Sequence, residues 1–141
     1  MKIYIAASWK HQHAVEMLTA ILREKGHVVL SFVENNHGEH LKSKDGKRLG
    51  FEEWIQTEEA DQSFDYDTIG ATRSHLVIYI GPSGKDAAAE VGAAWAAGVE
   101  ILGLHAKGED FGLMRKMIYW FDNYRKLLEA VDSRASAKGK L

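Results

Sequence analysis

The sequence predicts a single α/β domain built around a parallel sheet. Three short apolar runs, at residues 2–7, 28–32 and 76–80, lack the alternation of a half-exposed strand, which indicates strands buried on both faces. Segments with helical spacing separate these runs, and such alternation of strands and helices is typical of an α/β sheet. With 141 residues, the chain is long enough for one domain with a substantial core.

The first third predicts a strand, a helix, a second strand and a long loop. After strand 2–7, residues 11–25 place apolar side chains at helical spacing, and Gly26 is a suitable stop. Strand 28–32 follows. The polar, glycine-containing segment 34–50 predicts a loop that is either a lid or an insertion.

The middle of the chain returns to a helical pattern. Residues 51–74 predict two helices with a break near residues 61–63. Strand 76–80 comes next. A helix made almost entirely of small residues then covers 85–97, and Gly98 suits its end.

The last third predicts a strand at 100–105, a short helix at 111–117 and a short strand at 118–121. Asp122 is expected to cap a final helix that carries Leu127, Leu128 and Val131. The small and basic residues 133–141 predict a disordered tail.

Five such strands predict a three-layer sandwich of the flavodoxin- or Rossmann-like kind, with mostly parallel strands in the order 2-1-3-4-5, over residues 1–132. The ligand crevice of this topology lies beyond the carboxyl ends of the first and third strands, where the winding direction reverses. Two loops, 7–10 and 81–86, are expected to meet there.

Composition argues against several classes of protein. A net charge of −2 gives no general attraction to nucleic acid or to anionic membranes. The chain has no cysteine, which removes disulfides and thiol catalysis and fits a reducing compartment. Apolar runs are shorter than the roughly 20 residues of a membrane span, and the first strand begins too early for a signal peptide. We therefore expect a cytoplasmic protein that binds neither nucleic-acid polymers nor membranes.

Glu90 is the most informative single residue, because its neighbours on helix 85–97 are nearly all alanine, valine or glycine. The nearby helix N-terminus favours an ionised carboxylate by about 0.3–1 kcal/mol, unless burial outweighs this effect. An ionised, positioned carboxylate can attack the anomeric carbon of a glycoside. The alternative is a solvated helix residue.

Other polar groups fall near the same crevice. Asp86 shares a helix face with Glu90, although it could simply cap the helix. Asp67 could point inward or lie on the surface. Ser83 and Gly84, just before a helix, offer a hydroxyl and backbone N–H groups that suit an anion, although this signal alone is weak.

The loop after the first strand contributes Ser8 and Trp9, and the indole could stack on a planar base. Two histidine pairs have the spacing of metal ligands: His11 with His13, and His37 with His40. Neither is supported by cysteine or by an HExxH pattern, so we expect no metal site.

Four features together resemble the nucleoside 2-deoxyribosyltransferase family, including its nucleotide N-glycosidase branch. They are the opening strand with Tyr4, the segment 64–67 as an F-x-x-D helix, the segment 90–92 as an E-x-G nucleophile motif, and the order of the elements. The resemblance extends from residue 3 to about residue 121.

The resemblance implies a role for each matched residue. Glu90 would be the nucleophile, Tyr4 would orient its carboxylate, and Asp67 would contact or protonate the leaving base. Ser83 would match a phosphate-binding serine of the nucleotide-cleaving members, and Gly92 belongs to the E-x-G motif. The family needs no cofactor, acts on small nucleosides or nucleotides, and forms homodimers or larger homo-oligomers.

The chain also departs from the family pattern. Many members carry an acid six residues before the nucleophile and a glycine four before it, where this chain has Gly84 and Asp86. The sugar and base contacts, and so the substrate, are left open by these changes.

The leading hypothesis is an enzyme that acts on an N-glycosidic bond by hydrolysis or transfer, through a covalent intermediate on Glu90. One alternative is a non-catalytic domain that binds or senses nucleotides. Another is a NAD hydrolase of the TIR type, which also uses a glutamate. An electron carrier is disfavoured, because loop 7–10 lacks the small hydroxyl residues of a phosphate-cradling loop.

Overall fold

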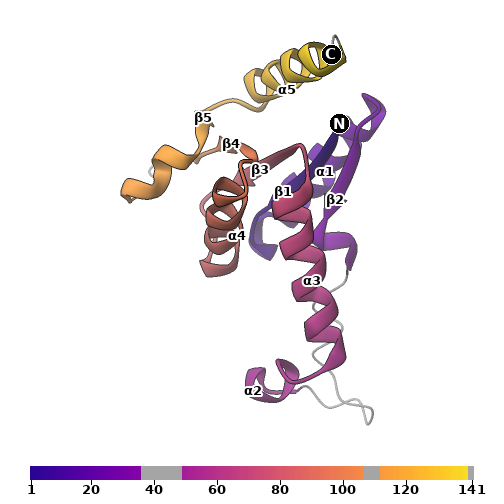
Figure 1. Ribbon diagram of the computed structural model, residues 1–141, viewed down its shortest axis with the longest axis vertical. Helices are drawn as coiled ribbons and strands as arrows, with labels where there is room; N and C mark the ends of the chain where they lie inside the picture. Colours follow the sequence, from indigo (N-terminus) through magenta and orange to yellow (C-terminus); the bar gives the residue numbers. More distant parts are fainter. Residues whose placement is uncertain (36–48, 107–111, 140–141) are drawn as a thin grey trace.

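Five parallel strands form one sheet in the order β2-β1-β3-β4-β5, as predicted (Figure 1). The computed structural model describes residues 1–35, 49–106 and 112–139. The strands are β1 (Lys2–Ala6), β2 (Val28–Ser31), β3 (Leu76–Ile80), β4 (Glu100–Leu104) and β5 (Tyr119–Phe121). The expected α/β class and strand order are confirmed.

Helices cover both faces of the sheet and make a three-layer sandwich. The helices are α1 (Gln12–Glu24), α2 (Phe51–Trp54), α3 (Glu58–Arg73), α4 (Lys85–Ala96) and α5 (Tyr124–Gly139). Figure 1 shows α3 and α4 next to one another on one side of the sheet, with α2 at the far end of α3. Short 3-10 helices lie at Trp9–His11, Phe32–Asn35 and Leu113–Met117.

Alternate residues of β1 face the two halves of the core, because successive side chains of a strand point to opposite faces. Ile3 and Ile5 pack with α1 and α5 on one face. Tyr4 and Ala6 pack with α3 and α4 on the other. All four are completely buried, which explains why the strand reads as a continuous apolar run.

The two helix ends predicted at glycines are confirmed, at Gly26 and Gly98. Gly26 (φ 92°) follows the last turn of α1, and Gly98 (φ 80°) follows the C-cap of α4. The left-handed conformation costs glycine nothing sterically, so each helix can end there.

The predicted break at residues 61–63 is wrong, because the chain breaks between α2 and α3 instead. The hydroxyl of Thr57 accepts a hydrogen bond from the backbone N–H of Ala60 and donates one to the carbonyl of Trp54. This N-cap starts a new helix, and residues 61–63 lie within its first two turns.

The end of the chain also differs from the prediction. The tail expected to be disordered from residue 133 continues α5 as far as Gly139, and in it Arg134 forms an ion pair with Glu100 and donates to the carbonyl of Ala130. The cap is Asn123 and not Asp122, since its side chain accepts from the backbone N–H of Arg125.

Most of the predicted loop 34–50 lies outside the described residues, apart from its two ends. The predicted short helix at 111–117 is a 3-10 helix over Leu113–Met117. Within the described ranges, no helix combines the length and the apolar character that a membrane span needs.

Candidate active site

A cleft of about 600 Å³ opens at the carboxyl ends of β1 and β3, where the topology predicts the crevice. The loop after β1, the helix α2, one face of α3 and the first turns of α4 form its walls. The lining residues are Tyr4, Ala7, Ser8, Trp9, Phe32, Phe51, Trp54, Asp67, Gly84, Lys85, Asp86, Ala87 and Glu90.

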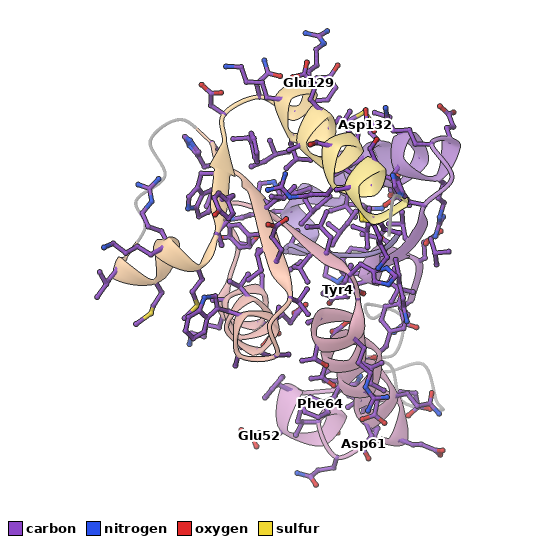
Figure 2. All side chains as sticks on the ribbon, turned by 45° about the horizontal axis from the view of Figure 1, so that its top comes forward. Tyr4, Glu52, Asp61, Phe64, Glu129 and Asp132 are labelled. Atoms are coloured by element: carbon purple, nitrogen blue, oxygen red, sulfur yellow. The ribbon has the colours of Figure 1, made fainter. Side chains whose placement is uncertain are left out.

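Tyr4 and Glu90 meet at the floor of this cleft. The Tyr4 hydroxyl donates a hydrogen bond to Oε1 of Glu90. Tyr4 sits on an interior strand of the sheet, where β1 pairs it with Leu30 on one side and Val77 on the other. In Figure 2 it lies where the sheet meets α3, well away from Glu129 on α5. The sheet, through Tyr4, therefore holds one carboxylate oxygen of Glu90, whose backbone belongs to α4.

Burial changes the ionisation of Glu90. Burial, with smaller contributions from the nearby Asp67 and Asp86 carboxyls, raises the pKa of Glu90 to about 8, and the hydrogen bond from Tyr4 opposes this rise. The helix N-terminus was expected to favour the ionised form unless burial outweighed it, and burial is the larger effect here.

Asp67 points into the cleft, which answers the question that the sequence left open. Burial raises the pKa of Asp67 to about 6, and its interaction with Tyr4 opposes the rise. The pKa of Tyr4 is also raised, by burial and by the two carboxylates. The three groups form one coupled cluster with two acids and one phenol.

Three polar atoms in the cleft wall lack a hydrogen-bond partner in the described part of the chain: Ser8 Oγ, Trp54 Nε1 and Asp67 Oδ1. All three are shielded from solvent. Unpaired buried polar groups are costly, typically about 1–3 kcal/mol each, so their grouping at one cleft is informative.

The structure places Ser83 between the two loops and not on the cleft wall. Its hydroxyl donates to the carbonyl of Ile80 (2.6 Å) and accepts from the backbone N–H of Ser8 (3.0 Å). Its own N–H donates to the Tyr79 hydroxyl (3.2 Å). His11 Nε2 lies 2.6 Å from the carbonyl oxygen of Pro82, in the loop between β3 and α4, and forms a hydrogen bond with it.

Of the other predicted site residues, four line the cleft and Gly92 does not. Ser8, Trp9, Gly84 and Asp86 line the cleft with the catalytic candidates. Gly84 is the N-cap residue of α4, so Asp86 is not the cap. Gly92 lies outside the cleft lining, and a Cβ added there would meet no atom within 4 Å.

Several cleft residues were missed by the sequence analysis, notably Phe32, Phe51 and Trp54. Phe32 packs edge-on against Trp9, with ring centroids 5.4 Å apart. Phe51 and Trp54 come from α2, whose two aromatic side chains three residues apart were the available signal. Across residues 1–35, 49–106 and 112–139, no three metal-ligating side chains gather in one place.

Two solved structures are similar to the chain over nearly its whole length. The CMP N-glycosidase BcmB of Clostridium botulinum is 20% identical, with a TM-score of 0.61 over 94% of this chain and 99% of that one. A 2-deoxyribosyltransferase from Bacillus psychrosaccharolyticus is 22% identical, with a TM-score of 0.65 over 90% of each chain. No protein-family model matches the sequence, and no curated protein matches it significantly. Both structures are of the kind that the resemblance names, and they confirm the fold that it predicts.

Proposed function

We propose that the protein cleaves the N-glycosidic bond of a nucleoside or nucleotide, by hydrolysis or by transfer of the 2-deoxyribosyl group. The observation that carries this proposal is the Glu90 carboxylate, held by the Tyr4 hydroxyl at an open cleft with Asp67 beside it. Both similar structures are proteins with N-glycosidic or deoxyribosyl chemistry in their names, which supports the same class here.

The reaction would proceed as a double displacement. An oxygen of ionised Glu90 attacks C1′ of the sugar, while the C1′–N bond breaks and its electron pair leaves with the base. Protonated Asp67 gives its proton to that base. Water or a second base then attacks C1′ from the vacated side, Glu90 departs as a carboxylate, and the proton of the attacking group passes to Asp67.

This chemistry needs one proton on the pair of carboxyls, and needs it on Asp67. With one group near pKa 6 and the other near 8, the two carboxyls together hold a single proton around neutral pH. Because Glu90 has the higher pKa, that proton rests mainly on Glu90, and the productive form arises when it passes to Asp67. The productive form is the one with Glu90 ionised and Asp67 protonated.

The cleft walls suit a planar base. Trp9, Phe32, Phe51 and Trp54 present aromatic surface on which a base can stack, and stacking tolerates different bases. The unpaired Trp54 N–H and Ser8 hydroxyl supply polar groups that a bound ligand can satisfy after a small shift.

We also propose that the protein works as a homo-oligomer. A second hollow of about 380 Å³ adjoins the first between α3 and α4, and it shares Asp67 and Glu90 with it. Phe64 on its rim is 67% exposed and Phe51 is 66% exposed. A second copy of the chain would cover this apolar surface, and light scattering after size-exclusion chromatography tests for it.

The decisive experiment is mass spectrometry of the intact protein mixed with deoxynucleosides, their 5′-monophosphates or NAD. A pentose adduct that maps to Glu90 and is absent in Glu90→Gln supports the proposal. Glu129→Gln, on the surface of α5 and far from Tyr4, is the matched control and should keep the adduct (Figure 2). Binding without turnover by both the wild type and Glu90→Gln would favour a sensing domain, and cleavage of NAD alone would favour a NAD hydrolase.

A further inference from the structure

We propose that Gly70, on α3, is a positioning residue for the nucleophile: its missing side chain forms the slot that holds the Tyr4 ring, and thereby fixes the hydroxyl that binds Glu90. This inference rests on the proposed function, in which Glu90 attacks the sugar.

The slot is defined by close approach. A Cβ built on Gly70 would lie 2.5 Å from Cδ2 of Tyr4, 2.9 Å from Cε2 and 3.2 Å from Cγ. Cβ atoms do not approach other heavy atoms within 3.0 Å in real proteins, so a methyl group here must displace the ring or the helix.

The Tyr4 ring has little room to yield. Tyr4 is completely buried, and its backbone is hydrogen-bonded between β2 and β3. The ring packs among side chains from α3, α4 and β3, including Ala71, Val77 and Val91. Interiors are packed as densely as organic crystals, so a displaced ring moves its hydroxyl as well.

Helix geometry does not require glycine at this position. Gly70 lies in the last turn of α3, before the C-cap Ser74, at a helical position where glycine is about 0.5–1 kcal/mol less favourable than alanine. Gly92, inside α4, shows the contrast, because a Cβ there meets nothing within 4 Å. The contact with Tyr4 is therefore the structural reason for the glycine on α3.

The same face of α3 carries both the slot and the second acid. Asp67 lies three residues before Gly70, so the two are neighbours on one helix face. The ring of Tyr4 lies against Gly70 while its hydroxyl reaches the two carboxyls. A shift of the ring by about 1 Å would lengthen the bond to Glu90, and misplacements of that size can cost about 100-fold in rate.

The test is Gly70→Ala, alone and combined with Tyr4→Phe. We expect the single variant to lower kcat by about 10- to 100-fold with KM changed only a few-fold, since the nucleophile and not the binding surface is disturbed. In the Tyr4→Phe background, which has no hydroxyl to misplace, the same substitution should leave kcat nearly unchanged. An equal loss in both backgrounds, or a wild-type kcat in the single variant, overturns the proposal.

A second readout does not depend on turnover. The hydrogen bond from Tyr4 lowers the pKa of Glu90, so ¹³C NMR titration of the Glu90 carboxyl should show a higher pKa in Gly70→Ala, as in Tyr4→Phe. If the proposed function fails, this titration still tests the slot, and an unshifted pKa refutes it. If Gly70→Ala does not fold, the smaller side chain in Tyr4→Leu/Gly70→Ala should restore folding, and failure to do so also refutes the slot.

Discussion

The hydroxyl of Tyr4, on the interior strand β1, donates a hydrogen bond to the carboxylate of Glu90, 86 residues later on α4. The bond joins an interior strand of the sheet to a helix that borders the cleft. Because Asp67 reaches the same phenol from α3, the two acids and the phenol titrate as one unit.

The first prediction concerns the pH dependence of the rate. We expect kcat/KM to follow a bell between limbs near pH 6 and pH 8. Below the lower limb the pair gains a second proton and Glu90 cannot attack; above the upper limb no proton remains for the leaving base. Initial rates across about pH 4.5–9.5 measure this. A flat profile would contradict the coupled pair.

The second prediction concerns stability. The pKa of Glu90 is raised in the folded protein from an ordinary value of 4.5 to about 8, so unfolding between these pH values releases a proton. Stability therefore falls as pH rises through this window. Glu90→Gln removes the effect, so its Tm should rise relative to wild type from about pH 5 to about pH 8.5.

The control for this measurement is Glu129→Gln, which removes one carboxylate from the surface of α5. The difference in Tm between Glu129→Gln and the wild type should change less with pH than the difference between Glu90→Gln and the wild type. If the plots of Tm against pH for the two variants run parallel, the burial of Glu90 is not the cause of the pH dependence of stability.

The third prediction separates a structural from a substrate-binding role for Ser83. Ser83→Ala removes both hydrogen bonds of the hydroxyl and leaves the N–H of Ser8 without its acceptor. We expect a loss of about 1–2 kcal/mol in the free energy of unfolding. The ratio of activity on 5′-monophosphates to activity on nucleosides should stay within a few-fold, and a selective loss on monophosphates would instead support the phosphate role.

The fourth prediction concerns the N-cap of α3. Thr57→Ala removes the bonds to Ala60 and Trp54, which should lower stability by about 1 kcal/mol. Because the hydroxyl also links the end of α2 to the start of α3, and α2 carries the cleft residues Phe51 and Trp54, KM should rise several-fold with little change in kcat. Thr57→Ser keeps the hydroxyl and should behave like the wild type; equal loss in both variants would argue against the cap.

Strands β1 and β3 could be predicted because burial on both faces produces a continuous apolar run. Strand 76–80 was predicted to the residue as β3, and the crossover rules then gave the order of the sheet. The break at Thr57 was missed because helical spacing continues across it, although a threonine followed by Glu58 and Glu59 is a capping signal.

The C-terminal turns of α5 could not be predicted from local sequence. They lack a strong apolar stripe, and their long-range polar contact is the ion pair of Arg134 with Glu100, 34 residues earlier on β4. An ion pair between segments so far apart has no local signature.

By itself, the sequence determined the sheet, the crevice at its carboxyl edge and the acids that could line it, since these follow from periodicity and chain connection. Only the tertiary structure decided that Asp67 turns inward, that Ser83 is bonded between loops, and that Glu90 holds its proton more tightly than an exposed acid does. The reason is that solvent exclusion, hydrogen-bond geometry and close approach, such as that of Gly70 to Tyr4, depend on segments that are distant in the chain and meet only in the folded molecule.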